Sequence, residues 1–319
     1  MNSIKDLRRR IKSTTNTSKI TKAMEMVSAA KMRRAVKGVL HVRPYAHAAW
    51  SVLQNLNRAF KEEKSGFLAV RKVKHVLVIL VTSNKGLCGS YNTQILKKIR
   101  EELQDPEKLM TNRVGFKKIN PEVSKEQLVI DFVTVGKKGE KFLRKMDKNI
   151  IASFPQLTYY SMVEDVRPLA KIAMDGYLEK TFDKVVVVYT DYISAIKQQV
   201  KVRQILPISK VDLEKQLLEM DALAKEYGFE EPEVEYKVEP SPKEVLNFIF
   251  PRLIEMQMYH ALLESNASKE SARMIALKNA TEAGKDMAAA FTLAYNQIRQ
   301  SKITQEISEI SAGRAALEG

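Results

Sequence analysis

The sequence has a single cysteine, Cys88, in 319 residues. One thiol excludes an internal disulfide and a zinc site built from cysteines, and it favours a reducing compartment. Long hydrophobic runs are missing as well. The longest, Val76–Val81, has the length of a strand, whereas a helix that spans a bilayer needs roughly 20 apolar residues. We therefore expect no membrane-spanning helix, and the start at Met1 shows no apolar signal region.

The sequence also lacks the motifs of common enzyme classes. It contains no G-x-x-x-x-G-K-[ST] phosphate loop, no H-E-x-x-H zinc motif and no G-x-S-x-G nucleophile motif. The four histidines are far apart in the chain; they are His41, His47, His75 and His260. We therefore expect no catalytic residue, no cofactor and no bound metal ion.

One glycine-containing turn is an exception to consider. Gly86–Gly89 follows an apolar run and precedes a helical pattern, a context in which free backbone amides can bind phosphate. The glycine spacing is not G-x-G-x-x-G. A tight turn from strand to helix is the simpler interpretation, with Cys88 as a small buried packing residue.

Proline and glycine are scarce in the C-terminal stretch 252–317, which has no proline and only Gly284 and Gly313. Apolar residues recur there at steps of three and four, typical of one side of a helix. They are Leu253, Met256, His260 and Leu263, then Met287, Phe291, Ala294 and Ile298, then Ile303, Ile307 and Ile310. An unbroken helix of this size would be roughly 100 Å long, so we expect a coiled coil.

Residues 1–60 predict a second long helix. Its apolar stripe is formed by Ile4, Leu7 and Ile11 and then by Ile20, Met24 and Val27. Met24, Met26 and Met32 are expected to pack in the seam between the helices. Between the two parts of the stripe lies Ser13–Ser18, which is a poor helix by propensity, so either tertiary contacts hold it helical or it frays.

The middle of the chain changes its hydrophobic period. Strands are predicted at Val76–Val81, Leu128–Val135 and Val185–Tyr189, and helices at Thr93–Leu103, Gly139–Met146 and Val163–Phe182. This alternation is typical of an α/β domain with a mainly parallel sheet. Ser194–Leu206 is expected to be an antiparallel edge strand, and Pro106–Pro121 a surface loop or an irregular connection.

The predicted fold is therefore α/β plus a long antiparallel two-helix coiled coil formed by the N- and C-terminal helices. The expected domains are an N-terminal coiled-coil helix at 1–60, a Rossmann-like α/β domain at 75–242 and a C-terminal coiled-coil helix at 243–319. The last pairs with the first because both helices leave the same domain.

The net charge of +15 is concentrated at the N-terminus. Residues 1–60 contain 13 lysines and arginines, against Asp6 and Glu25 as the acids. Exposed ion pairs contribute little to stability, so this excess points to an acidic partner: a nucleic acid, an anionic lipid or an acidic protein surface.

Three stretches resemble the gamma subunit family of F-type ATP synthases. At the N-terminus they are Ile11-Lys12-Ser13, Asn16-Thr17 and Lys19–Met32; at the C-terminus, Arg299–Ala315; and after the first strand, Gly86–Gly89 with Tyr91-Asn92. The similarity covers the chain in order, and the two terminal motifs are very specific. The chain lacks the cysteine-bearing insert of the chloroplast form, so the bacterial type is expected.

The resemblance implies a central rotor shaft without catalytic activity of its own. In that family, ion flow turns a ring of c subunits, and the shaft drives the catalytic beta subunits through their conformations. The implied partners are the alpha and beta subunits, including the acidic loop of beta, the epsilon subunit and the c-ring. The implied location is the cytoplasmic face of the cell membrane, to which the chain is peripheral through the complex.

The resemblance also implies which residues make these contacts. Met24 corresponds to the coupling zone near the acidic loop of beta. Positions that contact the stator ring or the other shaft helix are Arg273, Arg299, Gln300, Thr304, Glu306 and Glu309. The c-ring contact falls at Tyr236, Glu239 and Pro240. The small side chains of Ser311–Leu317 suit a tip that turns in a sleeve, although the long cation of Arg314 departs from the family pattern.

Two alternatives remain from the residues alone. One is a coiled coil that binds nucleic acid through the basic N-terminal helix; because no helix-turn-helix or stacking platform is found, we expect no nucleic-acid partner. The other is a phosphate-binding α/β enzyme that uses the turn at Gly86–Gly89.

Overall fold

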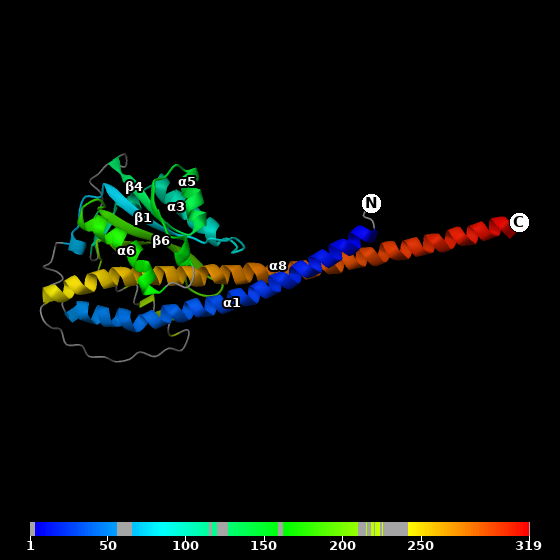
Figure 1. Cartoon of the computed structure of the whole chain (residues 1–319), viewed down its shortest axis with the longest axis horizontal. Coiled ribbons are helices and arrows are strands. Elements are labelled where there is room, and N and C mark those ends of the chain that lie inside the picture. The colour runs from blue at the N-terminus through cyan, green and yellow to red at the C-terminus, as the bar shows by residue number, and fades with distance from the viewer. Residues whose placement is uncertain are drawn as a thin grey trace. The chain divides into compact units, whose positions relative to one another are not determined.

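The computed structural model describes residues 4–55, 66–114, 117–119, 127–158, 162–209, 215, 218–219, 221–223, 225 and 242–318. The chain forms two compact units, residues 1–29 with 273–319 and residues 30–272. Two long helices, α1 (Ile4–Asn55) and α8 (Pro242–Glu318), contribute segments to both units (Figure 1). Among the described residues, no helix is long and apolar enough to cross a membrane.

The unit of residues 30–272 is built on a five-stranded sheet in the order β5-β4-β1-β6-β7. Its strands are β1 (His75–Val81), β4 (Val129–Val135), β5 (Ile150–Ser153), β6 (Lys184–Tyr192) and β7 (Gln198–Leu206). β1 pairs in parallel with both β4 and β6, and β7 pairs antiparallel with β6. The predicted strands and the antiparallel edge strand are confirmed.

Helices cover both faces of this sheet (Figure 1). One face packs against α3 (Tyr91–Gln104) and α5 (Lys137–Lys145), with Ile95, Ile99 and Leu143 fully buried. The other face packs against α6 (Val163–Leu178) and the first part of α8. The central strands are apolar on both sides for this reason, as continuous runs of valine, leucine and isoleucine indicate.

Short elements complete the unit. The stretch expected to be a loop contains α4 (Glu107–Met110) and a small antiparallel pair, β2 (Asn112–Val114) with β3 (Lys117–Ile119). Its loop assignment is therefore wrong in part, and the apolar pair Leu109-Met110 at its centre is fully buried. The 3-10 turns η1 (Gly66–Leu68) and η3 (Pro155–Thr158) flank the sheet. The sequence does not predict β5, because its four residues are too few to show the alternation of a strand.

The other unit consists of the two ends of the chain, residues 1–29 of α1 and 273–319 of α8. The two segments run antiparallel: the Ser18 hydroxyl donates a hydrogen bond to the Thr281 carbonyl, and the Arg10 guanidinium lies over the Phe291 ring. The predicted fold class, an α/β domain plus an antiparallel two-helix coiled coil, is confirmed. The run Ser13–Ser18 is helical, as expected where tertiary contacts support it.

Candidate coupling surface

The two terminal segments meet along a seam that has small side chains at its centre. Buried or half-buried residues of α1 follow each other at alternating steps of three and four: Leu7, Ile11, Thr14, Ser18, Thr21, Glu25 and Ser28. The facing residues of α8 have the same spacing: Leu277, Thr281, Gly284, Ala288, Phe291, Tyr295 and Ile298. This is the heptad spacing of a coiled coil.

Hydroxyl groups join the helices at the centre of the seam. The hydroxyls of Thr21 and Thr281 are 2.8 Å apart, and Ser18 donates to the Thr281 carbonyl at 3.1 Å. A Cβ atom added at Gly284 would lie 3.2 Å from the Ser18 Cβ, so the two backbones approach closely here. Serine and threonine side chains of α1 therefore form the centre of the contact surface between the helices.

The second half of the predicted apolar stripe is wrong. Ile20 is 60% exposed and Val27 53% exposed, and Met24 and Met26 are exposed beside them. On α8, Met287 is exposed and Ala288 takes the position in the seam. These apolar residues follow a helical spacing, but the close approach at Gly284 leaves room beside it only for small side chains. Of the three methionines expected in the seam, only Met32 is buried.

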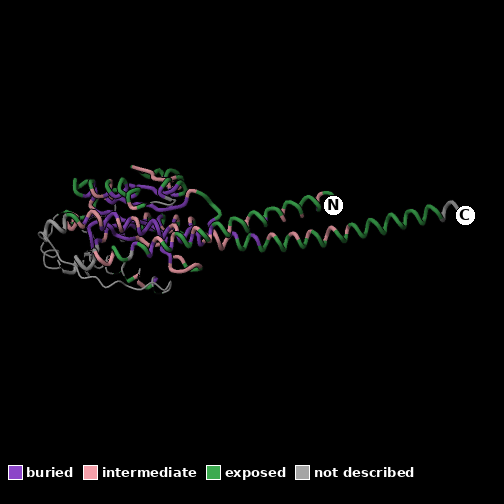
Figure 2. The backbone as a smooth tube through the Cα atoms, turned by 60° about the horizontal axis from the view of Figure 1, so that its bottom comes forward, coloured by how far each residue is buried: buried purple, intermediate pink, exposed green. Residues whose placement is uncertain are grey.

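The coupling residues expected on α8 lie mainly where the pairing has ended. Among the residues of α8 whose burial is described, Tyr295 and Ile298 are the last half-buried ones, and every residue from Arg299 to Arg314 is exposed (Figure 2). This stretch contains Arg299, Gln300, Thr304, Glu306 and Glu309. The third apolar stripe, Ile303, Ile307 and Ile310, is exposed there, up to 72% at Ile310.

The remaining expected positions differ in their surroundings. Met24 is exposed on α1, next to the ion pair that Lys22 and Glu25 form at 2.9 Å. Arg273 is half-buried on α8. Tyr236, Glu239 and Pro240, expected at the c-ring contact, lie outside the described residues.

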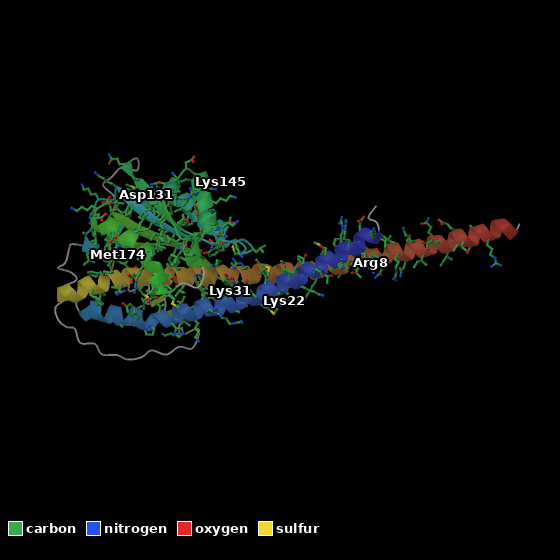
Figure 3. The ribbon with its side chains drawn as sticks, viewed as in Figure 1. Arg8, Lys22, Lys31, Asp131, Lys145 and Met174 are labelled. Atoms are coloured by element: carbon green, nitrogen blue, oxygen red, sulfur yellow. The ribbon has the colours of Figure 1, made fainter. Side chains whose placement is uncertain are left out.

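The paired segment carries positive charge on its surface. Residues 4–29 contain seven basic residues and two acidic ones. Arg8 and Lys22, labelled in Figure 3, are exposed on α1. The pairs formed with the two acids, Arg9 with Asp6 and Lys22 with Glu25, neutralise only part of this charge. The seam thus combines polar contacts at its centre with buried apolar residues such as Leu7 and Leu277, and its outer surface carries cations and exposed apolar side chains.

The turn at Gly86–Gly89 makes most of its contacts within itself. The Ser83 hydroxyl donates to the Lys85 carbonyl at 2.6 Å, and the Asn92 side-chain amide donates to both Ser83 and Cys88. Cys88 is buried, as expected, and Gly89 has a positive φ of 52°. The interpretation as a tight turn between β1 and α3 accounts for these residues. Among the residues that the structure describes, no group of three potential metal ligands is found.

Sequence reasoning missed the polar part of the seam. The signal was present, because Thr14, Ser18, Thr21 and Ser28 continue the heptad spacing of Leu7 and Ile11. A search restricted to apolar residues passes over hydroxyl side chains, although they pack and bond between helices when the backbones are close.

Comparisons with known proteins place the whole chain in one family. A family model described as ATP synthase matches residues 3–317. The chain is 36% identical to the ATP synthase gamma chain of Roseiflexus castenholzii, over 99% of both sequences, and 34% identical to that of Legionella pneumophila, over 98% of this chain and 99% of the relative. The gamma chain of Heliobacterium modesticaldum is 36% identical, over 99% of this chain and all of the relative.

Solved structures share the fold. A chain of the Euglena gracilis mitochondrial ATP synthase, in the structure of its OSCP, F1 and c-ring in rotational state 3, matches with a TM-score of 0.62 and 18% identity, covering 98% of this chain and 94% of that one. A chain of the Tetrahymena thermophila mitochondrial ATP synthase central stalk and c-ring matches with a TM-score of 0.53 and 24% identity, covering 82% of this chain and 99% of that one. The comparisons give no support to a nucleic-acid-binding coiled coil.

Proposed function

The chain belongs to the ATP synthase gamma chain family, and from this premise we propose that it is the central rotor shaft of an F-type ATP synthase. It couples rotation of the c-ring, driven by ion flow, to the conformational cycle of the catalytic beta subunits. The observation that carries this proposal is the match to bacterial gamma chains over nearly the whole length of the chain. ATP synthesis and ion transport are then activities of the complex.

The paired helical ends support a mechanical role. A shaft must resist bending, and two helices in heptad contact are stiffer than one. The exposed surface beyond the pairing is available to a surrounding ring, because α1 does not cover Arg299 to Arg314 among the described residues. The small side chains expected at Ser311–Leu317 leave a shallow surface, and packed interfaces of bulky residues would resist turning.

The coupling residues fall into two groups under this proposal. Arg299, Gln300, Thr304, Glu306 and Glu309 contact the stator ring, which their exposure favours over contact with α1. Arg273 is half-buried and suits contact with the other shaft helix. Met24 faces the acidic loop of a beta subunit, where the cations of α1 lie around it. Tyr236, Glu239 and Pro240 belong to the c-ring contact.

The chain has no catalytic role of its own under this proposal. Its partners are the alpha and beta subunits, the epsilon subunit and the c-ring, and it lies at the cytoplasmic face of the cell membrane as a peripheral part of the complex. ATP is bound and hydrolysed on the other subunits.

Purification of the tagged chain from its native membrane tests the proposal. We expect the alpha and beta subunits and the c subunit to co-purify with it, together with ATP hydrolysis. The chain purified alone should hydrolyse no ATP above the level of a mock preparation. Hydrolysis by the isolated chain, or co-purification without alpha and beta, would overturn the proposal.

A further inference from the structure

A buried polar cluster lies between the first part of α8 and strands β6 and β7, within the unit of residues 30–272. His260 and Glu264 are one helical turn apart on α8, at 0% and 3% exposure, and His260 Nδ1 is 3.5 Å from Glu264 Oε2. Within the part of the chain that the structure describes, neither ring nitrogen of His260 nor Glu264 Oε2 makes a hydrogen bond.

The charges around this pair are balanced without it. Lys201 Nζ lies 2.6 Å from Asp191 and 2.7 Å from Glu219, and Arg203 lies 2.7 Å from Glu219. Two cations of β7 therefore neutralise two carboxylates, that of Asp191 on β6 and that of Glu219. Glu264 is a third carboxyl group in the same buried region, and among the described residues Lys201 and Arg203 are already paired with the other two carboxylates.

The other described elements packed around the pair have their own contacts or lie exposed. Helix α1 lies beside this part of α8, where Gly38 meets Leu263, and its charged or titratable side chains there, Lys37 and His41, are exposed. Helix α3 contributes the Tyr91 hydroxyl, which bonds Ser265.

On the sheet side, the Tyr189 ring lies against the Arg203 guanidinium. Further along α8, Lys269 and Glu270 form a pair of their own at 3.9 Å.

A buried and uncompensated charge is strongly unfavourable. The pair avoids one when it holds a single proton, either on Glu264 beside a neutral imidazole or on His260 beside a carboxylate. Without that proton the pair carries a net negative charge beside Asp191. With a second proton it carries a positive charge beside Lys201 and Arg203.

We propose that His260 and Glu264 together hold one buried proton throughout the neutral pH range, and that this proton fastens residues 257–271 of α8 to strands β6 and β7. Loss of the proton at alkaline pH loosens α8 from the sheet. The pair thus makes the packing of α8 against the sheet dependent on pH. This proposal does not depend on the function proposed above.

The electrostatics of the two groups agree with this proposal. Burial, and next the charge of Asp191, raises the pKa of Glu264 well above its ordinary value. Burial, and next the cations of Arg203 and Lys201, lowers the pKa of His260 well below its ordinary value. Stability contributed at Glu264 is complete below its unfolded-state pKa and is lost as the pH rises through its raised pKa. At His260 the contribution is complete above its unfolded-state pKa and is lost as the pH falls through its lowered pKa.

Hydrogen exchange of the full-length chain tests the proposal without any substitution. We compare the protection of amides 257–271 with that of amides in α6, which packs on the same face of the sheet, at about pH 7 and about pH 10, after correction for the intrinsic rate. Protection of 257–271 should fall several-fold relative to α6. An unchanged ratio would overturn the proposal.

Substitution then assigns the effect to the pair. Glu264→Gln keeps the shape of the side chain and cannot ionise, so the alkaline loss of protection should disappear. The matched control is Glu255→Gln on the same helix, where the buried carboxylate pairs with Arg252 and Arg167 outside the cluster. This control should keep the alkaline loss of the native chain. An alkaline loss as large in Glu264→Gln as in the native chain would contradict the assignment.

Discussion

Gly284 lies in the seam, at a point where the two terminal helices approach closely. A Cβ at this position would already be 3.2 Å from the Ser18 Cβ, so a branched side chain cannot fit without moving a helix. We expect Gly284→Val to lower the free energy of unfolding by about 1–3 kcal/mol, as over-packing does elsewhere. Urea titration followed by far-UV circular dichroism measures this change.

Gly313 is the matched control on the same helix. Nothing lies within 4 Å of a Cβ added there. Gly313→Ala should leave the free energy of unfolding unchanged or raise it by up to about 1 kcal/mol, because alanine is the better helix former. Equal losses at both glycines would mean that the seam at Gly284 is not the cause.

At the scale of the element, the two halves of the stripe predicted on α1 differ in burial. Leu7 is 2% exposed and Ile20 60% exposed, although sequence pattern alone treats them alike. Leu7→Ala should cost about 2–4 kcal/mol through lost burial and the cavity left behind. Ile20→Ala should cost less than about 0.5 kcal/mol. Urea unfolding of both variants measures the two costs. A larger loss of stability at Ile20 than at Leu7 would contradict the observed seam and support the predicted apolar stripe.

The same comparison indicates how far sequence can predict these elements. The strands of the sheet were predictable because β1 and β6 are buried on both faces and read as continuous apolar runs. The position of the seam was not, because it depends on the distance between two backbones that no local pattern contains. Ser18, Thr21 and Thr281 are unremarkable in sequence and become contacts only when the helices pair.

The buried cluster on α8 escaped sequence reasoning for a related reason. The sequence places His260 in an apolar stripe, and the side chain is buried as that predicts. Glu264, one turn further on, is a residue type typical of an exposed helix face, yet it is buried too. Only the pairing of β6 with β7 brings Lys201 and Arg203 under it. The fold class could thus be predicted from period and motifs, whereas the polar contacts of α8 required the tertiary structure.

At the scale of the whole molecule, the functional assignment comes from family membership. Two long paired helices suit a part that transmits force. The domain limits 1–60, 75–242 and 243–319 stay a prediction, as do the coupling residues. The contact proposed for Tyr236, Glu239 and Pro240 depends on residues outside those described.

A reversible disulfide between the shaft and the ring tests the rotor proposal most directly. Met24→Cys places a thiol on the exposed side of α1, and a second cysteine is introduced in the acidic loop of beta; the native Cys88 is buried and can remain. We expect ATP hydrolysis by the assembled complex to fall in proportion to the yield of cross-link and to return on reduction, while oxidised complexes with either single cysteine stay active. Continued multiple turnovers with the cross-link fully formed would contradict a rotating shaft.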